Sequence, residues 1–193
     1  MPTDWEQRYK TGDTPWDKSA PHPALVDFLE MQPLRRKILV PGSGLGHDVR
    51  AISRGDNEVT GIDIAPSAVE RARTFQKSAG ENYRLADLFD LPPELCGVFD
   101  WVWEHTCFCA IDPARRADYA RSVADALKPG GHLLAVFYLD PGNGDDGPPF
   151  GVSTIELNAL FLPRFELLRD WEPLRTYAGR EHRERMRLLR RKE

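Results

Sequence analysis

Three glycines and one aspartate carry the clearest chemical signal in this sequence. Gly42, Gly44 and Gly46 follow the apolar run 38–40, and Asp63 ends a second apolar run about 20 residues later. Glycine lets the backbone turn tightly and come close to a ligand, while a helix that starts at such a turn presents unpaired N–H groups. A carboxylate at the end of the following strand can accept hydrogen bonds from both hydroxyls of a ribose. Together these residues predict a nucleoside-binding βαβ unit.

The spacing of the glycines favours one nucleoside over another. A dinucleotide pyrophosphate sits on a helix that opens with G-x-G-x-x-G, whereas the loop here has the spacing G-x-G-x-G. The sequence therefore favours S-adenosylmethionine as the cofactor, with a nicotinamide dinucleotide as the alternative.

Two further polar residues follow predicted strands. Asp87 comes after the predicted strand 83–86, where it could accept a hydrogen bond from the exocyclic amine of an adenine or simply be a solvated loop acid. His105 follows the predicted strand 99–103. Ligands of doubly wound sheets bind outside the carboxyl ends of the strands, near the point where the strand order reverses. His105 could therefore contact the cofactor, position a substrate, act as a base, or be structural.

The elements that position these residues alternate between apolar runs and helical patterns. This alternation predicts an α/β fold, a Rossmann-like doubly wound and mostly parallel seven-stranded sheet with an antiparallel edge strand, in an α/β/α sandwich. One domain is expected over residues 1–193. Parallel strands are predicted at 38–40, 59–64, 83–86, 99–103 and 132–138, helices at 23–31, 47–54, 66–77, 113–127 and 154–161, and an antiparallel pair at 164–172 and 183–190.

Two irregular segments are expected at the rim of the site. Residues 1–20 contain Trp5, Tyr9 and Trp16, and the first two share one face of a helix because they are four residues apart. They form either a short amphipathic helix packed on the domain or a lid over the cofactor. The stretch 139–151 is rich in Gly, Pro and Asp, and a loop of that length in a compact domain is usually functional.

Composition excludes several classes of partner. A net charge of −4 argues against nucleic acid, and the arginines and lysines between 180 and 192 are interpreted as the polar face of an edge strand. No apolar run is long enough for a membrane span, and no signal peptide is visible, which predicts a cytoplasmic protein. We expect a monomer. The cysteines are Cys96, Cys107 and Cys109, and their spacing fits neither a zinc site nor a disulfide framework. They are interpreted as reduced thiols, and no metal is expected.

Several motifs together resemble those of a known family. The sequence is similar to class I S-adenosylmethionine-dependent methyltransferases, more narrowly to the thiopurine S-methyltransferase superfamily, and within it to the plant and bacterial thiol and halide methyltransferases. The likeness runs nearly end to end. The segments that carry it are WEQRY at 5–9, TPWD at 14–17, VPGSGLGHD at 40–48, LKPGG at 127–131, CFCAIDP at 107–113 with Arg116, and GPPF at 147–150.

The resemblance assigns roles to individual residues. It implies that the aromatic residues Trp5, Tyr9 and Trp16 close over the cofactor. It places the loop glycines Gly42 and Gly44 near the methionine moiety, Asp63 on the ribose, and Asp87 with Leu88 on the adenine. Arg116 would face the cofactor and substrate region, and Arg180 would supply a second positive charge. His105 stands where plant relatives carry tyrosine.

The reaction implied by the resemblance is an in-line displacement at the sulfonium-bound methyl carbon, which leaves S-adenosylhomocysteine. An anionic acceptor such as a thiolate, thiopurine, thiocyanate or halide cancels the sulfonium charge in the transition state, so that a dry, aligned pocket accelerates the reaction without a general base. Two alternatives stay open: a NAD-dependent oxidoreductase and a non-catalytic module that binds S-adenosylmethionine.

Overall fold

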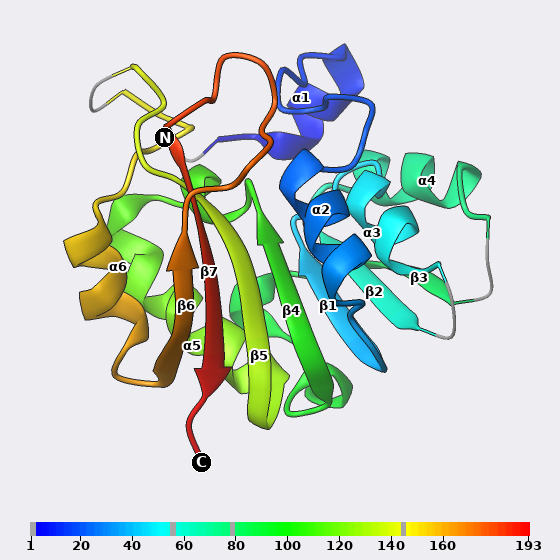
Figure 1. Ribbon diagram of the computed structural model, residues 1–193. Helices are drawn as coiled ribbons and strands as arrows, with labels where there is room; N and C mark the ends of the chain where they lie inside the picture. Colours follow the sequence, from blue (N-terminus) through cyan, green and yellow to red (C-terminus); the bar gives the residue numbers. More distant parts are fainter. Residues whose placement is uncertain (1–2, 55–56, 78–79, 144–145) are drawn as a thin grey trace.

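The fold is a seven-stranded sheet covered by helices on both faces (Figure 1). The computed structural model describes residues 3–54, 57–77, 80–143 and 146–193. The strand order is β3-β2-β1-β4-β5-β7-β6. The strands are β1 (Lys37–Pro41), β2 (Glu58–Asp63), β3 (Glu81–Leu85), β4 (Phe99–His105), β5 (Leu127–Tyr138), β6 (Phe165–Trp171) and β7 (Glu184–Arg191). This confirms the predicted fold class.

The strand order reverses next to β1, which pairs in parallel with β2 on one side and with β4 on the other. All residues of β1 after Lys37 are buried, as expected for a parallel strand covered on both faces. The antiparallel strand is β7, which lies between β5 and the edge strand β6. The carboxyl ends of β1 and β4 therefore form the crevice where a ligand is expected.

The helices form two outer layers. On one face, apolar side chains of α2 (Pro23–Met31), α3 (His47–Ile52) and α4 (Pro66–Thr74) share a core with β1 and β2. On the other face, α5 (Arg116–Ala126) and α6 (Thr154–Phe161) pack against β4, β5 and β7. The short helix α1 (Trp5–Thr11) lies above the carboxyl edge of the sheet, where it contacts α4 (Figure 1). Among the described residues, every helix is too short or too polar to span a bilayer.

The structure corrects several predicted boundaries, among them those of β5 and β4. The segment LKPGG at 127–131 ends the predicted helix, yet it is the first part of β5, and its backbone bends beside β4 at a register shift. Gly131 permits this approach, because a Cβ there would lie 2.9 Å from the Lys128 carbonyl oxygen and 3.2 Å from that of Phe99. Strand β4 continues two residues beyond its prediction, so that His105 is its last residue instead of a loop residue.

A buried carboxyl group ties β4 to α5. Glu104 is 1% exposed, and its oxygens accept hydrogen bonds from the Tyr119 hydroxyl and, at 2.7 Å, from the Phe108 amide. Burial raises the pKa of Glu104 to about 7, although both hydrogen bonds act in the opposite direction. The folded protein therefore holds a proton that the unfolded chain releases at a lower pH.

We expect this proton to make stability pH-dependent. Because the folded pKa lies above the ordinary 4.5, the contribution is fully present below about pH 4.5 and is lost as the pH rises through 7. The loss amounts to about 3 kcal/mol of unfolding free energy. In Glu104→Gln this part of the pH dependence should vanish, which urea unfolding at about pH 5 and about pH 8 measures. The exposed Glu70→Gln is the control, and a pH dependence unchanged in Glu104→Gln would contradict the expectation.

Candidate functional site

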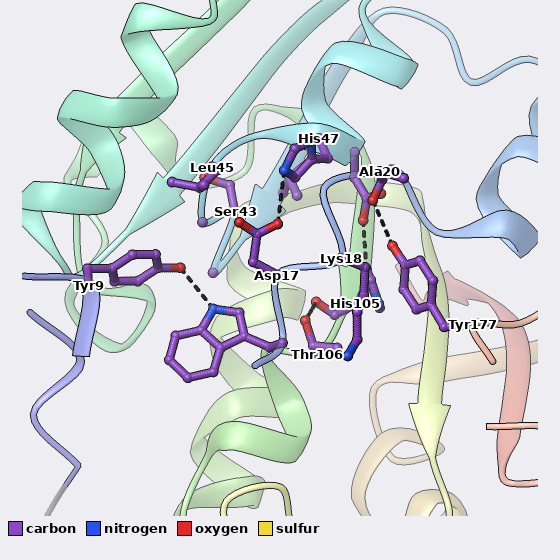
Figure 2. Close-up of a pocket in the computed structure, with 15 residues that line it drawn as sticks. Tyr9, Asp17, Lys18, Ala20, Ser43, Leu45, His47, His105, Thr106 and Tyr177 are labelled. Atoms are coloured by element: carbon purple, nitrogen blue, oxygen red, sulfur yellow. Dashed lines mark hydrogen bonds and ion pairs between the residues drawn. The ribbon is translucent and has the colours of Figure 1, made fainter. Parts of the chain in front are cut away.

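A pocket opens at the carboxyl ends of β1 and β4, beneath the segment that follows α1 (Figure 2). Segments far apart in the chain supply its walls: the amino-terminal segment, the glycine loop, the start of α3, the end of β4 and the loop before β7. The lining residues used below are Tyr9, Trp16, Asp17, Gly42, Gly44, His47, Asp48, His105 and Tyr177.

The glycine loop owes its shape to three left-handed residues. Gly42, Gly44 and Gly46 have φ values of +58°, +52° and +76°, which side chains rarely adopt. Other parts of the protein press against each of them: a Cβ on Gly44 would lie 2.8 Å from the Tyr9 hydroxyl, and one on Gly46 would lie 2.5 Å from the Tyr83 ring. Glycine is therefore required at these positions by the packing of neighbouring protein side chains, and not only by a bound ligand.

Asp63 holds the glycine loop against β2. Its Oδ2 accepts a hydrogen bond of 2.9 Å from the Gly44 amide, and its Oδ1 accepts one of 2.9 Å from the Ala65 amide. Burial raises the pKa of this carboxyl, and the backbone donors partly offset the rise. The Ile64 amide is a third backbone donor to this carboxylate, so part of the acceptor capacity of its two oxygens remains for a ligand hydroxyl.

Asp87 and Leu88 follow β3 at the same edge of the sheet. Asp87 is half-buried and caps the short 3₁₀ helix Leu88–Asp90, because its Oδ1 accepts a hydrogen bond of 2.8 Å from the Phe89 amide. The Leu88 side chain packs in the core, which supports this turn from below. The exposed Ile64, next to Asp63, adds an apolar surface at this edge.

The amino-terminal segment is folded down onto the glycine loop. Tyr9 is 6% exposed and accepts a hydrogen bond of 3.1 Å from Trp16 Nε1, and the ring centroids of Trp5 and Trp16 are 5.3 Å apart. Glu6 anchors the segment to α4, since its carboxylate accepts hydrogen bonds from the Ser67 amide (2.9 Å) and hydroxyl (2.8 Å). The three predicted aromatic residues therefore lie together.

The two predicted arginines lie in different surroundings. Arg116 is 3% exposed and donates to the Glu156 carboxylate and the Gly151 carbonyl oxygen, both at 2.8 Å, so it fixes the end of the long loop to α5 and α6. It is not among the residues that line the pocket. Arg180 donates to Glu184 at 3.0 Å and lies over the rings of Tyr138 and Tyr177, directly behind the pocket wall.

His105 reaches the pocket together with polar residues that the sequence analysis missed. Its Nδ1 lies 2.8 Å from Oδ2 of Asp48, the second residue of α3. His47 Nε2 lies 3.1 Å from Asp17, and Tyr177 donates to the Ala20 carbonyl oxygen across the pocket (Figure 2). The pair His47-Asp48 directly after the glycine loop was a usable signal, whereas nothing in the sequence around Tyr177 marks it.

Comparisons with known proteins give a consistent result. The family model for thiopurine S-methyltransferase matches residues 1–183. A probable thiol methyltransferase 2 of Arabidopsis thaliana is 34% identical over 165 residues, which cover 82% of this chain and 71% of the relative. Thiocyanate methyltransferase 1 of Brassica oleracea is 35% identical with the same coverage.

The fold also matches solved structures. The 1,6-didemethyltoxoflavin-N1-methyltransferase of Burkholderia thailandensis, solved with its substrate and S-adenosylhomocysteine, superposes with a TM-score of 0.77 at 18% identity, over 98% of this chain and 86% of that one. At this identity the likeness concerns the fold alone.

Proposed function

This chain belongs to the thiopurine S-methyltransferase family and is an S-adenosylmethionine-dependent methyltransferase of small acceptors, and we propose that its acceptors are thiols, thiopurines, thiocyanate or halides that bind next to the glycine loop. What supports this most directly is the pocket between the Asp63-anchored loop and His105, closed above by the aromatic amino-terminal segment.

The proposed position of the cofactor follows from the free acceptor atoms. The acceptor capacity that Asp63 retains binds the ribose, while Asp87 and the backbone of Leu88 bind the adenine, which rests on Ile64. The loop backbone at Gly42 and Gly44 lies next to the methionine moiety. Trp5, Tyr9 and Trp16 cover it, so the sulfonium group faces the part of the pocket lined by His105 and Tyr177.

The chemistry of this arrangement is alignment in a dry site. The acceptor attacks the methyl carbon in line with the bond to the sulfonium sulfur, and the sulfur keeps the bonding electron pair. Excluding water favours the step when an anion meets the sulfonium cation, because the charges cancel in the transition state. In this proposal Arg180 adds a positive charge behind Tyr177, whereas Arg116 acts indirectly by holding the long loop.

We expect the contact between Glu6 and Ser67 to influence cofactor affinity. Glu6→Ala removes the two hydrogen bonds that hold the amino-terminal segment down, and the KM for S-adenosylmethionine should rise about two- to tenfold. Lys10→Ala is the matched control, since it removes only the 3.2 Å ion pair to Glu6 and should leave the KM nearly unchanged. Equal changes of the KM in the two variants would show that the affinity depends on the surface charge and not on closure of the amino-terminal segment.

The proposed function is tested by measuring S-adenosylhomocysteine formation with an alkyl thiol, a thiopurine, thiocyanate and iodide. Turnover with at least one of these acceptors is expected. Thermal-shift measurements should show stabilisation by S-adenosylmethionine and none by NAD. Clear cofactor binding without turnover of any of the four acceptors would overturn the proposal and favour a non-catalytic binding module.

A further inference from the structure

A buried carboxylate fixes the imidazole of His105. Asp48 accepts hydrogen bonds from Trp103 Nε1 and from the His22 amide, each at 2.8 Å, in addition to its 2.8 Å contact with His105 Nδ1. Burial by itself would raise the pKa of Asp48, but His105 and the other donors outweigh it and lower the pKa to about 2. Asp48 is therefore ionised and can only accept, so the proton of a neutral His105 resides on Nδ1.

The other ring nitrogen of His105 is left as an unpaired acceptor. Nε2 is buried, and it has no hydrogen-bond partner among the described residues. The His105 side chain is 10% exposed and lines the pocket beside Tyr177 (Figure 2). Because this buried nitrogen belongs to a residue that lines the pocket, a molecule bound there can be its partner.

The neighbouring histidines differ from His105 in this respect. His22 is fully buried, its Nδ1 accepts the Ala24 amide at 3.2 Å, and its Nε2 lies 3.0 Å from Glu184, so both nitrogens are engaged. His47 Nδ1 accepts from Arg50. Its Nε2 likewise lacks a hydrogen-bond partner among the described residues, but it lies 3.1 Å from the Asp17 carboxylate, whereas no carboxylate faces His105 Nε2. His105 thus has a carboxylate at Nδ1 and an unpaired Nε2. Proteins use this arrangement for a histidine that acts as a general base.

Several charged and titratable groups surround His105. They are the Asp48 carboxylate from α3, the His22 ring at 4.5 Å with the Glu184–Arg180 pair behind it, the Tyr177 ring at 5.8 Å, and the buried Glu104 next to it on β4. Burial lowers the pKa of His22, whose Nδ1 accepts a backbone donor, so His22 does not compete as a proton acceptor.

We propose that His105, oriented by Asp48, is the general base that takes the proton of a neutral thiol, and that the substrate class of this site is therefore a proton-bearing thiol. This rests on the proposed methyltransferase function. In the reaction the S–H proton passes to His105 Nε2 and the sulfur lone pair forms the new S–CH₃ bond. The bond between the methyl carbon and the sulfonium breaks, and its electron pair stays on S-adenosylhomocysteine. The proton later leaves to water.

The need for a base depends on the acceptor. An alkyl thiol has a pKa near 8.5, so only a few per cent is thiolate at about pH 7, and an apolar pocket lowers that fraction further. Thiocyanate and iodide carry no proton and gain nothing from a base. General-base catalysis typically contributes about 10²- to 10⁴-fold.

The test compares His105→Gln with the wild type in the pH profile of kcat/KM for an alkyl thiol. At about pH 7 the variant should lose about 10²- to 10⁴-fold, and its remaining activity should rise about tenfold per pH unit with the thiolate fraction, while the wild-type profile levels off. With thiocyanate or iodide, where turned over, the loss should stay within about tenfold. Asp48→Asn should show the same altered profile to a smaller degree.

A control variant and two contrary results distinguish a failure of the His105 proposal from a failure of the methyltransferase function. His182→Asn alters an exposed histidine outside the pocket and should keep the wild-type profile, and thermal unfolding verifies that each variant folds. A His105→Gln profile parallel to that of the wild type would overturn the proposal. So would methylation of thiocyanate or iodide with no turnover of thiols, although that result would leave the methyltransferase function intact.

Discussion

Replacing Asp63 with alanine is expected to weaken binding of S-adenosylhomocysteine by about a hundredfold or more. Hydrogen bonds to a charged group contribute about 1.5–3 kcal/mol each, and two ribose hydroxyls would lose their acceptor. The same change frees the Gly44 and Ala65 amides, so the glycine loop should also become less ordered. Isothermal titration calorimetry measures the affinity, and thermal unfolding without ligand measures the loss of stability.

Two further variants make the result for Asp63 specific. Asp90→Ala removes an exposed carboxylate from the same edge of the sheet and should leave the affinity within about twofold. Asp63→Asn keeps the side-chain volume and one carbonyl acceptor, so its affinity should fall between those of the wild type and Asp63→Ala. If Asp63→Ala folded and bound the product as tightly as Asp90→Ala, the proposed cofactor position would be wrong.

The second large effect is expected at Gly46, the last glycine of the loop. Gly46→Ala must place a Cβ at a φ of +76° and within 2.5 Å of the Tyr83 ring. The backbone strain costs about 1–2 kcal/mol and the overpacking about 1–3 kcal/mol, so the unfolding free energy should fall by about 2–5 kcal/mol. Urea unfolding of the ligand-free protein measures this directly.

Gly97 provides the matched control for Gly46. It has a φ of +66°, yet a Cβ there would meet nothing within 4 Å. Gly97→Ala should therefore cost only the backbone strain, about 1–2 kcal/mol. The difference between the two variants isolates the contact with Tyr83, and equal losses would mean that Tyr83 moves aside without cost.

The fold could be predicted because buried parallel strands are recognisable in the sequence as apolar runs. Strands β1, β2 and β4 lie where mainly apolar segments predicted them. Asp63 and His105 are the last residues of β2 and β4, and Asp87 lies just beyond β3. That placement follows from topology, since all parallel strands end at one edge of the sheet. The positions of these side chains at one edge of the sheet could therefore be predicted from their places in the sequence, without knowledge of any tertiary contact.

Contacts between distant segments were beyond the reach of the sequence. Tyr177 meets Ala20, and Glu184 meets His22, over separations of 157 and 162 residues, and neither pair forms a local pattern. The placement of Arg116 behind the long loop instead of in the pocket likewise depends on where Gly151 and Glu156 lie. Such details arise from tertiary packing, which periodicity does not encode.

The place of β7 has a consequence for how the polypeptide is completed during synthesis. Among the described strands, β7 is synthesised last but is inserted between β5 and β6. Its first residue, Glu184, accepts a hydrogen bond from Arg180 and contacts His22. Until residues 184–191 emerge from the ribosome, β6 has no partner strand and one side of β5 stays open. The nascent chain therefore carries two unpaired strand edges, the kind of surface that chaperones shield, from the completion of β6 at Trp171 until β7 has followed.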